Sequence, residues 1–127
     1  MNVKLGISSF DETTPLEKTG KTISHDQRIR DLLEEIVLAD HLGIDAFAIG
    51  EHHRKDFAVS APEIVLTAAA AKTKQIHLSS ATTNMPTINP ILVYEQYATM
   101  DAIAPGRIEI MAGRGSLLKH LIFLAMI

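Results

Sequence analysis

The sequence predicts an α/β fold in which about four parallel strands alternate with helices. Four short apolar runs are separated by three longer segments whose apolar residues recur at helical spacing. Successive runs that are each followed by one helix typically form right-handed parallel units. The strand cores are apolar at successive positions, which indicates that both faces of the sheet are covered. The 127 residues correspond in size to one domain.

The first strand is expected over Val3–Ile7, and a polar loop follows over residues 8–24. A helix is predicted from about Asp26 to Leu42, because its apolar residues share one face at helical spacing: Ile29, Leu32, Leu33 and Ile36. Gly43 lies just beyond its last turn, where glycine favours the end of a helix.

The second and third strands are expected over Asp45–Ile49 and Ile76–Ser80. Between them, a polar loop over residues 51–60 leads to a helix from Pro62 to about Lys74. Proline is well tolerated at the first position of a helix, because the N–H that it lacks would have no partner there.

A loop is expected over Ala81–Asn89, followed by a helix that begins at Pro90 and ends before Pro105-Gly106. The fourth strand is then predicted over Arg107–Met111. This order of elements fits both a doubly wound sheet and a (β/α) barrel. No G-x-G-x-x-G motif follows any strand, so the dinucleotide-binding form of the doubly wound sheet is disfavoured.

Composition and charge exclude several classes of protein. Lys and Arg total 12 against 15 Asp and Glu, so the chain has no basic excess that would favour nucleic acid. The absence of cysteine excludes a disulfide scaffold and a cysteine nucleophile, and it fits a cytoplasmic protein. The longest apolar run, Leu121–Ile127, is far shorter than the roughly 20 residues of a membrane helix. We therefore expect neither a nucleic-acid partner nor a membrane.

Glu51-His52-His53 follows the second strand, at the edge of a parallel sheet where ligands bind. Neighbouring histidines tend to point to opposite sides, so this pair is a poor chelator of one metal ion, and we expect no metal site. Two interpretations stay open. Either one histidine binds local backbone and the other meets solvent, or the carboxylate holds an imidazole that exchanges protons in a pocket.

Two further segments are expected at the same edge. Gly113-Arg114-Gly115-Ser116 offers backbone N–H groups, a guanidinium and a hydroxyl, which together suit a phosphate, although many exposed turns share this pattern. Thr82-Thr83-Asn84 either lines a pocket with hydroxyl groups or simply ends a strand.

Several separated stretches, in order and spacing, resemble the bacterial luciferase-like, FMN-dependent monooxygenases: residues Leu42–His53, Ala61–Thr73, Thr87–Pro90 and Gly106–Ser116. Light-emitting members tend to carry a cysteine where this chain has Gly113, so the resemblance is to the general oxidoreductase branch. It implies a TIM (β/α) barrel that binds reduced FMN from a separate flavin reductase and uses O₂ to oxidise a small organic substrate.

The resemblance also implies roles for individual residues. His52 matches the pocket histidine linked to catalysis, with Glu51 and His53 supporting it. Arg114 and Ser116 match positions near the FMN phosphate. Ala81-Thr82 matches a cofactor-binding position where the family often has a non-proline cis peptide bond beneath the flavin ring.

A complete barrel needs about 250 residues, so we expect residues 1–116 to be the amino-terminal half of one. The resemblance stops after Ser116, and we hypothesise that a shift of reading frame produced residues 117–127, which the gene's nucleotide sequence would test. The chain is expected to bind flavin poorly, to be impaired as an enzyme and to form a homo-oligomer through exposed strand edges.

Two functions other than an FMN-dependent monooxygenase are alternatives for this sequence. The first is a catalytically silent half-barrel that acts as a binding or self-assembly module. The second is a metal-dependent hydrolase that uses His52 and His53.

Overall fold

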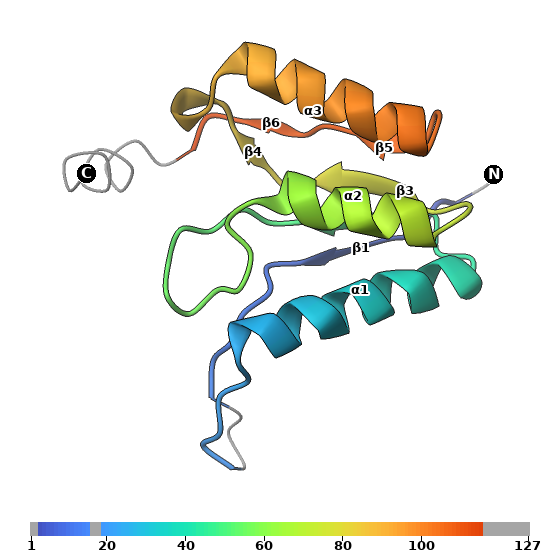
Figure 1. Cartoon of the computed structure of the whole chain (residues 1–127). Coiled ribbons are helices and arrows are strands. Elements are labelled where there is room, and N and C mark those ends of the chain that lie inside the picture. Colours follow the sequence, from blue (N-terminus) through green and yellow to red (C-terminus); the bar gives the residue numbers. More distant parts are fainter. Residues whose placement is uncertain (1–2, 16–18, 116–127) are drawn as a thin grey trace.

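The computed structural model of the chain describes residues 3–15 and 19–115 and confirms the α/β fold (Figure 1). Four strands pair in parallel in one sheet, in the order β1–β2–β3–β5. They are β1 (Gly6–Ser9), β2 (Ala46–Ile49), β3 (His77–Ser80) and β5 (Ile108–Glu109). The three connections each contain one α-helix: α1 (His25–His41), α2 (Pro62–Lys72) and α3 (Pro90–Ile103).

The helix bounds agree with the predicted ones to within one or two residues, because local capping groups define them. The Ser24 hydroxyl accepts a hydrogen bond from the Gln27 N–H (3.4 Å) at the start of α1. The Asn89 side chain accepts one from the Ile91 N–H (2.9 Å) at the start of α3. Within the described part of the chain, no helix combines the length and the apolar character needed to cross a bilayer.

The first strand lies over Gly6–Ser9, later along the chain than the predicted Val3–Ile7. Ser8 and Ser9 pair with Ala48 and Ile49 although they are polar. An edge strand is held by backbone hydrogen bonds, which polar side chains do not prevent. The bounds of the apolar run therefore differ from the bounds of β1.

The predicted loop over Ala81–Asn89 and the predicted strand over Arg107–Met111 are wrong in detail. Beyond the main sheet, β4 (Thr83–Asn84) and β6 (Ala112–Gly113) form a second, short parallel pair. The Thr83 N–H donates to the Met111 carbonyl (2.9 Å) where this pair begins, and a 3₁₀ turn, η1 (Met85–Thr87), follows β4. Small and polar residues form these strands, which is why the apolar pattern missed them.

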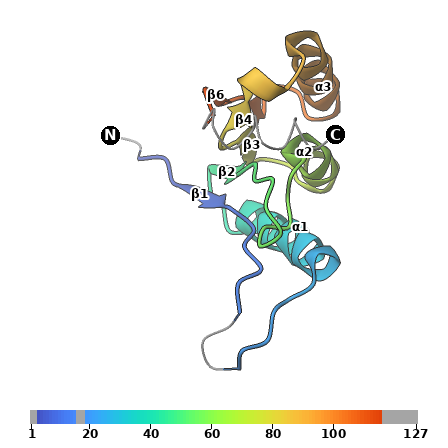
Figure 2. The same ribbon diagram turned by 90° about the vertical axis from the view of Figure 1, so that its left-hand side faces the viewer.

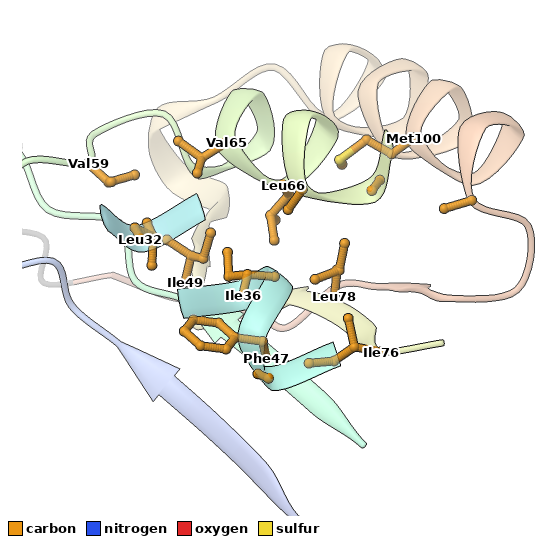
Figure 3. Packing of buried hydrophobic residues seen from close by; sticks show 14 residues of the cluster. Leu32, Ile36, Phe47, Ile49, Val59, Val65, Leu66, Ile76, Leu78 and Met100 are labelled. Atoms are coloured by element: carbon orange, nitrogen blue, oxygen red, sulfur yellow. The ribbon is translucent and has the colours of Figure 1, made fainter. Parts of the chain in front are cut away.

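All three helices lie on one side of the sheet (Figure 2). The core fills the space between them and the sheet (Figure 3), and its largest side chains come from every layer: Leu32 and Ile36 of α1, Phe47 and Ile49 of β2, Leu66 of α2, Leu78 of β3 and Met100 of α3. Burial of these side chains is the main source of stability of the fold.

The expectation that the strands are apolar on both faces is wrong for the face opposite the helices. Its alternate positions carry small or polar residues, namely Gly6, Ser8, Ala46, Ala48, His77, Ser79 and Glu109. At the margins of the sheet, exposed apolar side chains are Leu5 just before β1, Ile7 within it, and Ile110 after β5.

Buried polar contacts close the end of the sheet at which the strands begin. The Asp40 carboxylate, in the last turn of α1, accepts hydrogen bonds from three successive backbone N–H groups, of Lys74, Gln75 and Ile76, at 2.8–2.9 Å. Burial alone would raise the pKa of Asp40, but these donors outweigh it and hold the pKa below its usual value. The Arg107 guanidinium donates to the last carbonyls of α2 and its following loop, those of Ala70, Thr73 and Ile76.

Candidate functional site

The carboxyl ends of the four strands bring separate polar segments to one edge of the sheet, here called the rim. Parallel strands end at the same edge, and ligands of α/β proteins bind there. The Gly50 N–H donates to the Ser9 carbonyl (2.9 Å), and the Ala81 N–H donates to the Ile49 carbonyl (2.7 Å). These bonds align the segments of the rim, which are residues 10–12, 51–53, 81–84 and 112–115.

Glu51 connects two segments of the rim. One carboxylate oxygen lies 2.7 Å from His53 Nε2, and the other accepts the Asn84 N–H at 2.9 Å. The side chain of Glu51 is largely buried. The sequence left open whether the carboxylate holds an imidazole, and in the structure it does, but the imidazole is that of His53.

His52 lies instead between two phenylalanine rings. Its ring stacks on Phe57 with centroids 4.2 Å apart, and it meets the Phe10 ring edge-on at 5.3 Å. Gly50 leaves room for this arrangement, since a Cβ there would lie 2.5 Å from Phe10 Cδ1. Neither phenylalanine was predicted to belong to the site, because each lies in a polar stretch with no periodic pattern.

Asp11, also not predicted from the sequence, is the chain neighbour of Phe10 and is itself held by several contacts. Its carboxylate is buried, accepts the Ser9 hydroxyl (2.9 Å) and lies 3.2 Å from the Arg28 guanidinium. Burial raises the pKa of Asp11, and the Ser9 hydrogen bond and the Arg28 charge offset this only in part. The Asp11 carbonyl accepts the Ala58 N–H (2.8 Å), so the loops after β1 and β2 are joined.

The peptide bond between Ala81 and Thr82 is cis, as the resemblance implies. Both residues are half-buried, and the Thr82 side chain packs against Gly113, in the segment that follows β5. A Cβ at Gly113 would overlap the Thr82 side chain, and a Cβ at Gly115 would overlap the Asn84 side chain. The two glycines that flank Arg114 are therefore needed for close packing within the rim.

Arg114 is exposed, and its guanidinium forms no hydrogen bond or ion pair with the other residues that the structure describes. A guanidinium without a carboxylate partner suits the paired oxygens of a phosphate. Ser116, the second predicted phosphate contact, lies outside the described residues.

The two histidines of the metal-dependent alternative have different partners, a carboxylate for His53 and aromatic rings for His52. Among residues 3–15 and 19–115, no three His, Cys, Asp or Glu side chains are grouped so that they could hold a metal ion. The rim thus combines one imidazole among aromatic rings, one carboxylate–imidazole pair and one guanidinium. Such a set can bind an anion and exchange a proton.

Four parallel strands connected through three helices, with polar groups at the carboxyl ends of the strands, are the architecture of part of a (β/α) barrel. The family model described as luciferase-like monooxygenase matches residues 3–122, and the chain belongs to this family. Its fold is a partial TIM barrel.

Two curated relatives and one solved structure illustrate the similarity. The chain is 33% identical over 99 residues to the N-acetyl-S-alkylcysteine monooxygenase of Bacillus subtilis, a match that covers 77% of this chain and 28% of that protein. It is 29% identical over 102 residues to the oxygenase component of the flavin-dependent trigonelline monooxygenase of Acinetobacter baylyi, covering 80% and 28%. Monooxygenase RslO1 of Streptomyces bottropensis superposes with a TM-score of 0.84 and 27% identity, covering 97% and 36%. The chain therefore spans about a third of the length of these proteins.

Proposed function

We propose that this chain is the amino-terminal part of a cytoplasmic, FMN-dependent monooxygenase that oxidises a small organic substrate with O₂. The observation that supports the proposal most is the rim. There the His52 imidazole, the Glu51–His53 pair and the Arg114 guanidinium, which has no partner among the described residues, lie in segments that follow the carboxyl ends of the strands. One relative is flavin-dependent and is an oxygenase component, which supports flavin as the cofactor and a separate reductase as its source.

The residues of the rim fit a flavin phosphate and a reacting substrate. Arg114, together with Ser116, would bind the phosphate, and the Ala81–Thr82 segment would lie against the flavin ring. Reduced FMN supplies the electrons with which one oxygen atom of O₂ enters the substrate. The ring nitrogens of His52 form no hydrogen bond with the described residues, so His52 is free to exchange a proton with a ligand. Glu51, itself paired with His53, would hold the Asn84 N–H.

Titration of the chain with FMN, followed by flavin fluorescence, tests this function. We expect saturable but weak binding, because the chain spans about a third of the length of its relatives. Arg114→Ala should weaken binding about tenfold, which is the loss of one charged hydrogen-bonded contact. Arg30→Ala is the control, because Arg30 pairs only with groups of its own helix, α1. No saturable binding, or equal binding by wild type and Arg114→Ala, would contradict the proposal.

The second candidate, a silent self-assembly module, is favoured by the exposed apolar side chains at the two margins of the sheet, Leu5 and Ile7 on one side and Ile110 on the other. Two copies would bring the open edges of β1 and β5 together and cover these side chains. Absence of FMN binding, together with a concentration-dependent dimer in analytical ultracentrifugation, would favour this module over the enzyme.

A further inference from the structure

A buried cluster of hydroxyl groups lies directly behind the rim. Thr83 Oγ1 is 2.8 Å from Ser80 Oγ, 3.0 Å from the Tyr97 hydroxyl and 3.5 Å from Glu63 Oε1. Ser80 and Thr83 are completely buried, and Glu63 is 7% exposed. The cluster therefore joins β3, β4, α3 and α2 at one point.

Glu63 has no counter-charge within the described chain. The titratable groups that face it are acidic: Glu51 beyond β4, Tyr97 of α3, and Glu95 across a groove of about 240 Å³ between α2 and α3. A buried carboxylate without a cation is costly, whereas a neutral carboxyl group is not. Burial raises the pKa of Glu63 and the Glu51 charge acts in the same direction, while hydrogen bonding to the Glu63 backbone N–H and to Thr83 offsets this rise only in part.

The hydrogen-bond inventory is consistent with a neutral Glu63. Thr83 has one hydroxyl hydrogen and two lone pairs, so it cannot donate to both Glu63 and Ser80. A protonated Glu63 can donate to Thr83, and Thr83 can then donate to Ser80. In this arrangement the Tyr97 hydroxyl can donate to the remaining lone pair of Thr83, since either oxygen of that contact can be the donor, and Ser80 Oγ also accepts the Met111 N–H (3.4 Å).

We propose that Glu63 is a positioning residue, which acts as a neutral hydrogen-bond donor to Thr83 and so fixes the rim. The Thr83 N–H donates to the Met111 carbonyl, and the Met111 N–H donates to Ser80, so the cluster positions both β4 and the chain leading to Arg114. The relevance of this cluster to cofactor binding rests on the proposed function, because the rim holds a flavin only if that function is correct.

The pH dependence of stability tests the protonation of Glu63. A carboxyl group whose pKa is higher in the folded than in the unfolded chain stabilises most below its unfolded value, near 4.5, and loses this as the pH rises through the folded value. Glu63→Gln donates to Thr83 at every pH. Urea unfolding from about pH 4 to about pH 9 should therefore show a loss of wild-type stability relative to Glu63→Gln with rising pH. A constant difference between the two proteins would overturn the proposal.

Amide hydrogen exchange tests positioning separately from protonation. Glu63→Ala should speed exchange of the Thr83 and Met111 amides about tenfold beyond any global change, the effect of one buried hydrogen bond, and Glu63→Gln should not. Val65→Ala, a core truncation on the same helix, is the matched control. It should change the exchange rates of the rim amides and of the other core amides by similar factors. Equal behaviour of Glu63→Ala and Val65→Ala at the rim would overturn the proposal. Neither measurement uses FMN. A failure of the proposal about Glu63 can therefore be distinguished from a failure of the chain to bind FMN.

Discussion

Replacing Asp40 with alanine should lower the free energy of unfolding by about 3 kcal/mol. The side chain is buried and accepts hydrogen bonds from the N–H groups of residues 74–76. Its removal leaves three donors of the loop between α2 and β3 without a partner, one of them fully buried. Urea unfolding at neutral pH measures the loss, and Glu34→Ala, an exposed change on the same helix, should stay within about 0.5 kcal/mol of wild type.

The contribution of Asp40 should depend on pH in a defined direction. Its pKa is lowered by folding, so its stabilisation is complete above the unfolded pKa, near 3.8, and is lost as the pH falls through the folded value. The stability difference between wild type and Asp40→Asn should therefore shrink below about pH 4. A difference that stays constant to lower pH would show that the carboxylate charge is not what holds the loop.

Gly113→Ala is expected to lower the free energy of unfolding by about 2 kcal/mol and to disrupt the rim. The new Cβ would lie 2.7 Å from the Thr82 Cβ and would overlap the Thr82 hydroxyl as well. Because β6 pairs with β4 through this residue, the two short strands must separate or shift. Urea unfolding and the amide NMR signals of Thr83 and Asn84 report the two effects.

Two variants control for the glycine itself. Gly6→Ala also adds a methyl group to a strand, but its Cβ would make ordinary contacts of 3.6 Å with Ala46, so stability should change little. Thr82→Gly combined with Gly113→Ala removes the overlapping side chain and should recover part of the loss. If Gly113→Ala is as stable as wild type and leaves the β4 signals in place, the described packing of the rim is wrong.

The sequence predicted the helices better than the strands. Ser24, Asn89 and Pro62 are local signals that act within a few residues, so the starts of α1, α2 and α3 could be found without knowledge of the fold. β1 and the β4–β6 pair depend on backbone hydrogen bonds between distant segments. Their residues are small or polar, and no local pattern distinguishes them from loops.

Parts of the site were predictable, either from a family motif or from neighbouring titratable residues. The cis bond at Ala81-Thr82 was expected from the resemblance and is present. The carboxylate–imidazole pair was expected as one of two alternatives, but whether His52 or His53 takes part depends on side-chain directions that spacing does not fix. The rings around His52 and the buried Glu63 come together only through tertiary contacts.

Whether the carboxyl-end rim binds FMN can be measured by NMR mapping of FMN onto the ¹⁵N-labelled chain. Weak binding is sufficient, because chemical shifts report the bound fraction at each amide. We expect the shift changes to concentrate at Thr82–Asn84 and Ala112–Gly115 and to be absent at Lys74 and Gln75, at the opposite end of the sheet. No shifts at saturating FMN, or shifts that gather at the Asp40 end, would contradict FMN binding at the rim.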